Sequence, residues 1–153
     1  MTQKPGVLIA MSGGVDSSVT AGLLQRAGYD CTGVFMCLGQ TAKEGGSHPG
    51  CCSPEDARDA REVADRLGIK FHVLNFQKDL EMIVNYFVQE YKRARTPNPC
   101  ILCNSRLKFG KLVEFADMIG ASYVATGHYA RIEEREGRKW LCRGRDHGKD
   151  QSY

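Results

Sequence analysis

Two groups of residues in this sequence have the types and spacing that chemistry requires. The first is the loop Ser12–Ser18, SGGVDSS, which directly follows the apolar run Val7–Met11. Adjacent glycines let backbone amides approach an anion, serine hydroxyls add donors, and a following helix contributes the positive end of its dipole. The loop lacks the lysine of a GxxxxGK[ST] motif, which would span β- and γ-phosphates. We therefore expect a cradle for pyrophosphate, suited to an ATP that is split between its α and β positions.

The second group is the C-x-x-C formed by Cys100 and Cys103. Its spacing fits half of a zinc site, a redox pair, or a nucleophile with a helper. A four-cysteine zinc site would need a second pair, and Cys51 and Cys52 are poorly placed for chelation because they are adjacent. The flanking prolines predict a fixed turn at Cys100, and nearby cations favour the thiolate, which is the reactive form.

Basic residues surround this cysteine pair. The basic segment Tyr91–Lys111 contains six Lys or Arg side chains and no acidic one, so a total charge of +3 leaves −3 for the remainder of the chain. The six cations are Lys92, Arg93, Arg95, Arg106, Lys108 and Lys111. Such a segment indicates a polyanion nearby, and a solvated helix face is the alternative interpretation.

Length and composition exclude several classes of protein. The chain has 153 residues, 42% hydrophobic and 25% charged, which is typical of one folded domain and not of a disordered or fibrous protein. Its apolar runs are far shorter than the roughly 18 to 20 residues that cross a bilayer, and MTQKPG lacks the apolar stretch of a signal peptide. We expect a cytoplasmic protein with no membrane association, whose seven cysteines are thiols or metal ligands.

Apolar runs alternate with helical periodicity along the chain. Four buried strands are predicted, over residues 7–11, 31–38, 71–76 and 123–126. Helices are predicted between them, the last over 112–119, with a start at Ser53 and stops at Gly28, Gly68 and Gly120. This alternation predicts an α/β fold, a doubly wound parallel sheet with helices on both faces. Ligands of such sheets bind beyond the carboxyl ends of the strands, here the loops after Met11, Leu38 and Thr126.

The last residues lie outside this pattern. Residues 131–143, with a polar centre at Glu136–Arg138, are typical of a β-hairpin. The chain then stops at GKDQSY without a helix stop or loop signal. We therefore expect a nucleotide-binding domain over 1–130 and, over 131–153, the start of a further region that is truncated.

Several motifs together resemble one family. SGGVDSS after a buried strand is similar to the signature of the PP-loop ATP pyrophosphatases, which adenylate a carbonyl oxygen and release pyrophosphate. The loop alone would also admit NAD and GMP synthetases, argininosuccinate synthetase and several tRNA-modifying enzymes. The stretches GVFM, RTPNPCILCN, KFG, ATGHYAR and KDQSY follow in the order typical of the tRNA 2-thiouridylases of the MnmA/TrmU type, from about Gly6 to Tyr153.

This resemblance implies a fold, an activity and a set of partners. The fold is the Rossmann-like PP-loop domain, related to the adenine nucleotide alpha hydrolases. The activity is ATP-dependent 2-thiolation of an anticodon wobble uridine, with ATP and Mg²⁺ as cofactors. The partners are tRNA and a protein that donates persulfide sulfur.

The resemblance also implies roles for individual residues. Cys103 matches the catalytic nucleophile of the family. The residues matching its nucleotide contacts are Ala10, Met11, Ser12, Gly13, Gly14, Val15, Asp16, Ser17, Met36 and Gly127. Those matching its tRNA contacts are Asn98, Pro99, Cys100, His128, Lys149, Asp150 and Gln151. No residue is assigned as a metal ligand, although Asp16 could help to position the Mg²⁺ ion.

Two departures from the family pattern concern cysteines. Many members have aspartate where this chain has Cys100, which leaves room for a disulfide or for ligation of an iron–sulfur cluster. A second family cysteine, the carrier of the persulfide, is expected beyond Tyr153, because Cys142 does not match its context. We therefore expect this chain to be the ATP-binding part of the enzyme and to be inactive in thiolation by itself.

Two other functions remain open from the residues. One is a carbonyl-adenylating ligase or amidotransferase that uses the same loop on a small molecule, although a small substrate needs no six-cation segment. The other is a non-catalytic RNA-binding module whose C-x-x-C holds zinc.

Overall fold

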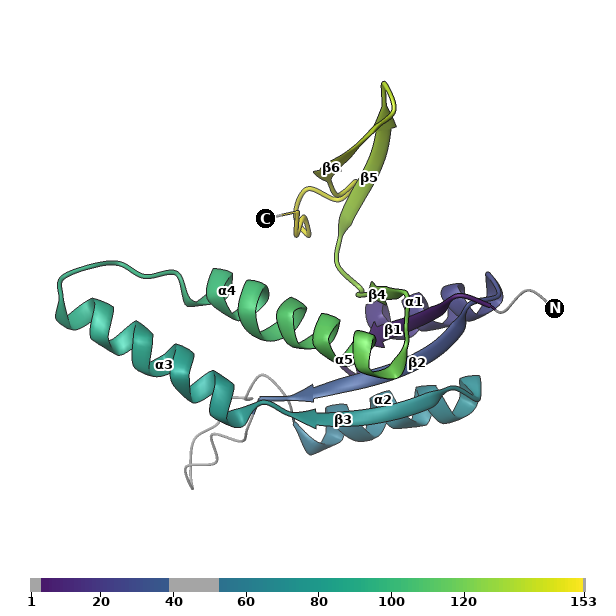
Figure 1. The fold of residues 1–153 in the computed structure, drawn as a ribbon, viewed down its shortest axis with the longest axis horizontal. Coiled ribbons are helices and arrows are strands. Elements are labelled where there is room, and N and C mark those ends of the chain that lie inside the picture. The colour runs from purple at the N-terminus through teal and green to yellow at the C-terminus, as the bar shows by residue number, and fades with distance from the viewer. Residues whose placement is uncertain (1–3, 39–52, 153) are drawn as a thin grey trace.

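The computed structural model describes residues 4–38 and 53–152 (Figure 1). The strands are β1 (Gly6–Ala10), β2 (Asp30–Cys37), β3 (Lys70–Asn75), β4 (Tyr123–Ala125), β5 (Ala130–Arg135) and β6 (Arg138–Arg143). The helices are α1 (Val15–Arg26), α2 (Pro54–Leu67), α3 (Gln77–Lys92), α4 (Pro99–Leu102), the π-helical η1 (Cys103–Gly110) and α5 (Lys111–Ile119). The predicted loop 39–50 with Cys51 and Cys52 lies outside the described residues.

Four strands form the central sheet, in the order β3-β2-β1-β4, and all its pairings are parallel. In the register, Val7 of β1 lies between Cys31 of β2 and Tyr123 of β4. The predicted strands and the doubly wound α/β fold are therefore confirmed. Because the strands are parallel, the loop after β1 and the segment after β4 emerge side by side at one edge.

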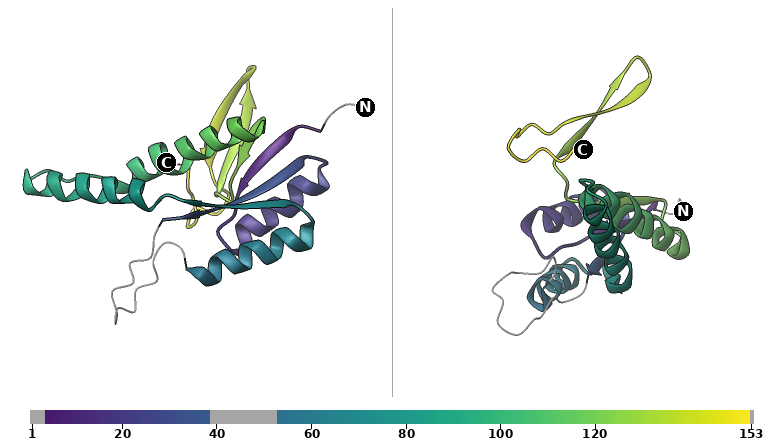
Figure 2. Two further views of the ribbon diagram at one scale, coloured as in Figure 1. Left: turned by 60° about the horizontal axis from the view of Figure 1, so that its bottom comes forward. Right: turned by 90° about the vertical axis from the view of Figure 1, so that its left-hand side faces the viewer.

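Successive residues of β1 face opposite sides of the sheet, as the two-residue period of a strand requires. Val7 and Ile9 belong to a buried cluster with Ala21 of α1, whereas Leu8 packs in a second cluster with Leu112 of α5. Figure 2 shows α1 and α2 on one face of the sheet and α5 on the other. A strand covered on both faces needs the continuous apolar run that predicted it.

Helix boundaries follow the predicted local signals. Ser53 caps α2, since its Oγ accepts from the Asp56 amide at 3.0 Å while its own amide donates to the Asp56 carboxylate at 2.9 Å. Gly68 and Gly120 end α2 and α5 in the left-handed conformation, with φ of +65° and +72°. Glycine adopts this conformation at little cost, so both stops have a local cause.

The apolar stripe that predicts α1 is not the face that the helix buries. Val15, Val19 and Leu23 are 77%, 53% and 61% exposed, whereas Ser17 and Ala21 are buried against the sheet. Leu24 also packs from α1 against the core cluster that contains Val7 and Ile9. Spacing alone identified the helix but not its orientation.

The helix predicted over 112–119 begins much earlier. Pro99 opens α4, and the chain stays helical through η1 and α5 to Ile119, forming with α3 the long helical arm of Figure 1. Asn98 caps this start, because its Oδ1 accepts from the amides of Cys100 at 3.1 Å and Ile101 at 3.3 Å. The prediction of a fixed turn at Cys100 is therefore wrong, since Pro99 occupies the first helical position, where its missing N–H costs nothing. No helix within the described ranges is long and apolar enough to cross a membrane.

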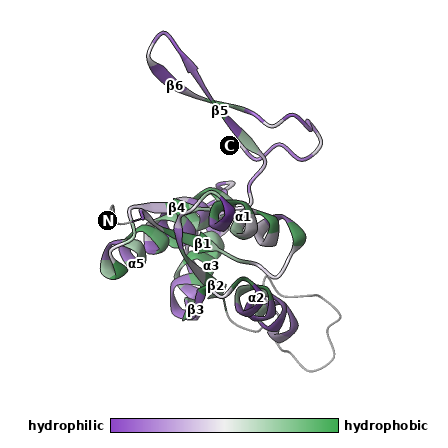
Figure 3. Ribbon diagram, turned by 90° about the vertical axis from the view of Figure 1, so that its right-hand side faces the viewer, coloured by the Kyte–Doolittle hydropathy of each residue, from purple (hydrophilic) through white to green (hydrophobic). Residues whose placement is uncertain are grey.

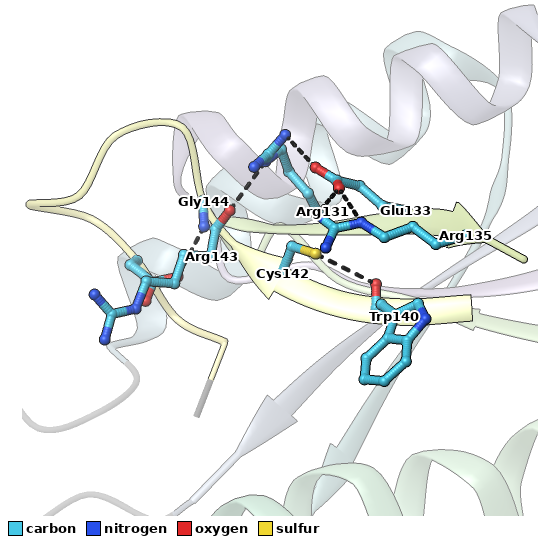
Figure 4. Close-up of polar contacts among 8 residues, drawn as sticks. Arg131, Glu133, Arg135, Trp140, Cys142, Arg143 and Gly144 are labelled. Carbon is cyan, nitrogen blue, oxygen red and sulfur yellow. Dashed lines mark hydrogen bonds and ion pairs between the residues drawn. The ribbon is translucent and has the colours of Figure 1, made fainter. Parts of the chain in front are cut away.

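The hairpin β5–β6 forms a separate two-stranded antiparallel sheet that projects from the body. Glu136 and Gly137 make its turn, both with positive φ. Arg131 and Arg135 both pair with Glu133 along β5 (Figure 4). Figure 3 shows that the hairpin is mostly hydrophilic, whereas the body contains green, hydrophobic stretches among hydrophilic ones. The predicted hairpin is confirmed.

Candidate functional site

The loop between β1 and α1 lies at the carboxyl edge of the sheet. The Met11 amide donates to the Val34 carbonyl at 2.8 Å, which continues strand pairing up to the start of the loop. Gly13 has φ of +80°, a conformation that glycine adopts without strain. Gly14 is the N-cap of α1, and no side chain of the described residues caps this helix start. The first amides of α1 are therefore left for a ligand or for water.

The loop serines mainly fix the shape of the loop. The Ser17 hydroxyl is buried, accepts from the Ser12 amide at 3.1 Å and donates to the Gly14 carbonyl at 3.0 Å. Ser18 donates to the same carbonyl at 2.9 Å. The exposed Ser12 hydroxyl accepts from the Gly14 amide at 3.4 Å and lies 3.3 Å from the Ser17 oxygen. Since Ser17 and Ser18 use their protons on Gly14, Ser12 holds the hydroxyl proton that can turn to a ligand.

Two glycines let neighbouring elements close on the loop. A Cβ at Gly13 would lie 2.5 Å from the carbonyl oxygen of Asp56, in the first turn of α2. A Cβ at Gly127, just beyond β4, would lie 2.9 Å from the Ser17 amide nitrogen and the Asp16 carbonyl carbon. Any side chain at either position would displace the loop. The contact with Asp56 has no signal in the sequence, because the capping pattern locates the start of α2 but not the loop beside it.

Tyr129, to which sequence analysis assigned no role, also contacts the loop. Its hydroxyl donates to Asp16 Oδ1 at 2.7 Å. This hydrogen bond, followed by desolvation and the charge of Asp16, raises the pKa of Tyr129. Tyr129 lies within the motif ATGHYAR, but a contact across 113 positions has no local signal.

The apolar residues of the predicted nucleotide set belong largely to the core. Met11 is buried, and a Cβ at Gly33 would lie 2.7 Å from its sulfur. Ala10 and Met36 are half-buried beside the cluster that contains Leu8. Only the backbone of Met11 and the outer edges of Ala10 and Met36 can therefore face a ligand.

The C-x-x-C lies on the continuous helix formed by α4, η1 and α5, called the arm helix below, and not on a turn. Cys100 is exposed in the first turn, and Cys103 follows one turn later, half-buried against the main core cluster. A spacing of three places both thiols on one side of the helix. Figures 1 and 2 show α4 on the side of the molecule where β1 and β2 end. Among the described residues no disulfide forms, and no three His, Cys, Asp or Glu side chains gather as a metal site.

His128 connects the end of β4 with the arm helix. Its Nδ1 lies 2.7 Å from the Thr126 hydroxyl, and its ring centroid is 5.7 Å from that of Phe109 in η1. Partial burial of the ring, and then the charge of Lys108, lower the pKa of His128. The structure thus brings one residue expected to contact tRNA next to the helix that carries Cys103.

The predicted tRNA contacts at the end of the described chain differ in their surroundings. Asp150 turns inward, where its carboxylate accepts from the Gly144 amide at 2.8 Å and the Ser152 hydroxyl at 3.1 Å. The Gly144 bond is the main reason why the pKa of Asp150 is lowered. Lys149 places its ammonium nitrogen 5.2 Å from the Tyr129 ring centroid. Asp150 thus shapes its own segment, and Lys149 remains exposed.

Half of the cations in the basic segment have acidic partners. Arg93 and Arg95 both pair with Glu90, at 3.2 and 3.3 Å, and the Glu90 side chain is only 10% exposed. Lys111 pairs with Glu114 at 2.9 Å, which raises the pKa of Lys111. Lys92, Arg106 and Lys108 make no ion pair with another described residue. The segment contains no acid in sequence, but folding supplies acids from the helices that flank it.

Comparison with known proteins identifies the family. The family model described as tRNA methyl transferase HUP domain matches residues 5–153. The chain is 55% identical over 155 residues to the tRNA-specific 2-thiouridylase MnmA of Clostridium perfringens, and 48% identical over 161 residues to that of Geobacter metallireducens. The chain belongs to the MnmA family of tRNA-specific 2-thiouridylases. Both alignments cover 100% of this chain but only 43% and 44% of the relatives, so it spans less than half of their length.

Solved structures of lower identity support the fold of this MnmA-family chain. The NH3-dependent NAD synthetase of Campylobacter jejuni superposes with a TM-score of 0.54 at 18% identity, over 80% of this chain and 47% of that one. The glutamine-dependent NAD+ synthetase of Acinetobacter baumannii, in complex with ADP, gives 0.57 at 22% identity, over 82% and 22%. These similarities concern the fold alone.

Proposed function

We propose that this chain forms the ATP-binding part of an enzyme that 2-thiolates an anticodon uridine of tRNA. The main supporting observation is the loop after β1. Because positions 13 and 127 are glycines, α2 and the segment after β4 can pack directly against this loop. Membership of the MnmA family supports tRNA as the substrate.

The loop residues fit the phosphates of ATP. The amides at the start of α1 have no side-chain cap within the described chain, and the loop backbone is free of side chains at Gly13 and Gly14. Such amides bind anions well because they donate hydrogen bonds at the positive end of the helix dipole. The exposed Ser12 hydroxyl adds one more donor. The nucleotide set expected from sequence, Ala10–Ser17 with Met36 and Gly127, lies around this loop and the neighbouring strand ends.

Mg²⁺ fits the same site in a supporting role. The described residues offer no group of three metal-ligating side chains. A Mg²⁺ ion typically keeps several waters and binds nucleotide phosphates with few protein ligands. It would neutralise the charge of the departing pyrophosphate.

The chemistry follows from the poor leaving ability of a carbonyl oxygen. The uridine O2 would attack the α-phosphorus of ATP, breaking its bond to pyrophosphate and leaving O2 as part of a good leaving group. Persulfide sulfur would then displace AMP from C2, which forms the C–S bond and breaks the C–O bond. The first amides of α1 would stabilise negative charge as the phosphates separate.

Cys103 is proposed to release the new thiocarbonyl. After displacement, the transferred sulfur is still bonded to the sulfur of its carrier cysteine. The Cys103 thiolate would attack that carrier sulfur, forming a disulfide and freeing the sulfur on C2. Cys100 lies one turn earlier on the same helix, where it is exposed to a substrate.

Asn98, Pro99, Cys100 and His128 are proposed to meet the tRNA. Asn98 caps the arm helix, so contact with RNA would occur at a helix start that is already ordered. Lys92, Arg106 and Lys108 would supply phosphate contacts. Lys149 and Gln151 would add contacts from the end of the chain.

The test uses the full-length protein with a tRNA transcript, ATP and a persulfide source. The proposal predicts pyrophosphate, AMP and 2-thiouridine as products, and predicts that Ser12→Ala and Asp16→Ala remove all three while circular dichroism stays unchanged. ADP and orthophosphate as products would contradict it. Zinc bound at one equivalent and lost together with folding would favour an RNA-binding zinc module instead.

A further inference from the structure

We infer that Tyr129 is a positioning residue for the nucleotide loop, which holds the Asp16 carboxylate in one orientation and is itself held by the segment Gly144–Ser152. This inference rests on the proposed function, because it takes the loop to be the ATP site. It gives Tyr129 a role at the loop Ser12–Ser18, and it links this loop to the segment Gly144–Ser152, neither of which the sequence motifs indicate.

Asp16 has little else to fix its side chain. It is exposed in the first turn of α1, and only its Oδ1 has a hydrogen-bond partner in the described chain, the Tyr129 hydroxyl at 2.7 Å. Asp16 would help to position the Mg²⁺ of Mg·ATP, whereas a carboxylate turned toward the phosphates themselves would repel them, so its orientation affects the affinity of the loop for the nucleotide. Tyr129 binds Oδ1 and so sets this orientation, which leaves Oδ2 available to the ion.

Tyr129 is in turn enclosed by the segment Gly144–Ser152. The Tyr129 amide donates to Gln151 Oε1 at 3.1 Å, and its carbonyl accepts from the Gln151 amide at 2.9 Å. Gly144 is buried against the same carbonyl, since a Cβ there would lie 3.0 Å from the Tyr129 oxygen. Asp150 holds Gly144 in this place through the 2.8 Å bond to its amide.

These contacts form one continuous path from Gln151 through Tyr129 to Asp16. Lys149 and Gln151, proposed above to contact tRNA, lie at one end, and the nucleotide loop lies at the other. A change at Gln151 should therefore alter ATP affinity even without RNA, whereas a residue that only contacts RNA should not. By linkage, RNA bound at this segment would change ATP affinity, and ATP would change RNA affinity by the same factor.

The test measures the dissociation constant of Mg·ATP by calorimetry, without RNA, in the full-length protein. Tyr129→Phe removes only the hydroxyl and should weaken binding about tenfold, the effect of losing one hydrogen bond to a charged group. Gln151→Ala should also weaken ATP binding. Gln151→Glu should bind ATP as the wild type does, because the Tyr129 backbone amide keeps a side-chain acceptor. The double variant Tyr129→Phe with Gln151→Ala should bind ATP no more weakly than Tyr129→Phe alone. Tyr123→Phe is the matched control, an exposed tyrosine on β4 that keeps its ring contact with Tyr29, and should bind ATP normally.

The outcomes separate this inference from the proposed function. Wild-type protein that binds no ATP would overturn both. Wild-type binding with Tyr129→Phe within twofold of it would overturn the inference and leave the proposed function standing. If Tyr129→Phe does not fold, the variants Gln151→Ala and Gln151→Glu provide the test, because both keep the Tyr129 hydroxyl. Equal ATP affinities of Gln151→Ala and the wild type would then overturn the inference.

Discussion

Gly127 lies so close to Ser17 that a Cβ at position 127 would come within 2.9 Å of the Ser17 amide nitrogen. The Asp16 carbonyl carbon would lie equally close, and both it and the Ser17 nitrogen are backbone atoms. Neither can move aside without shifting the loop or the end of β4. We predict that Gly127→Ala lowers the free energy of unfolding by about 1 to 3 kcal/mol. It should also weaken Mg·ATP binding, measured by calorimetry, because the loop amides are displaced.

The control for this prediction is Gly22→Ala. A Cβ at Gly22, inside α1, would meet nothing within 4 Å, so alanine there should raise stability by up to about 1 kcal/mol without affecting ATP. If the two variants bind ATP equally well, the packing at Gly127 does not support the loop.

The cysteines should react with alkylating agents in an order set by exposure. Cys100 is exposed, whereas Cys31 is buried, and burial followed by the charge of Asp30 raises the pKa of the Cys31 thiol. We expect iodoacetamide at neutral pH to label Cys100 first, Cys103 more slowly and Cys31 last, as measured by peptide mass spectrometry. Labelling of Cys31 as fast as Cys100 would contradict this order.

Cys103→Ser should remove tRNA thiolation in the full-length protein. Serine keeps the size of the side chain but cannot form the disulfide proposed to release sulfur, so binding of ATP and tRNA should stay close to normal. Cys142→Ser, another half-buried thiol but on the hairpin, is the control and should retain activity. Thiolation by Cys103→Ser would transfer the proposed role to Cys100.

The cations of the basic segment should separate into two groups. Replacing Lys92 and Lys108 by glutamine should flatten the salt dependence of tRNA binding by roughly one slope unit, or slightly less, for each lost phosphate contact. Replacing Arg93 and Arg95 should mainly lower stability, by roughly 1 to 2 kcal/mol after allowance for solvent screening, because it leaves the Glu90 carboxylate without its partners. Salt titrations and urea unfolding measure the two effects, and identical behaviour of both pairs would refute the division.

Acid should loosen the segment that ends at Ser152. The pKa of Asp150 is lowered in the folded protein, chiefly by the Gly144 amide, so its contribution to stability is present above the unfolded value of about 3.9 and is lost as the pH falls through the folded value. Amide signals of Gly144 and Ser152 should therefore shift and exchange faster below about pH 4. Asp150→Asn should remove this transition, and an unchanged profile in that variant would exclude Asp150 as its source.

Features with a local cause were predictable from the sequence. The parallel strands appear as apolar runs because both of their faces are covered, and Ser53, Gly68 and Gly120 set helix ends through contacts within a few residues. The loop 12–18 was recognisable for the same reason, since its glycines, its serines and the following helix are contiguous.

Only the tertiary structure decided which residues meet across the sheet. The hydrogen bond from Tyr129 to Asp16 joins positions 113 apart, and the closeness of Gly13 to Asp56 depends on how α2 packs beside α1. The buried face of α1 was likewise decided by how the helix packs on the sheet, which buries Ser17 and Ala21 and leaves Val19 and Leu23 exposed. Sequence periodicity records the spacing of side chains along one element, whereas these contacts depend on the distance and orientation between elements, which only packing of the whole chain determines.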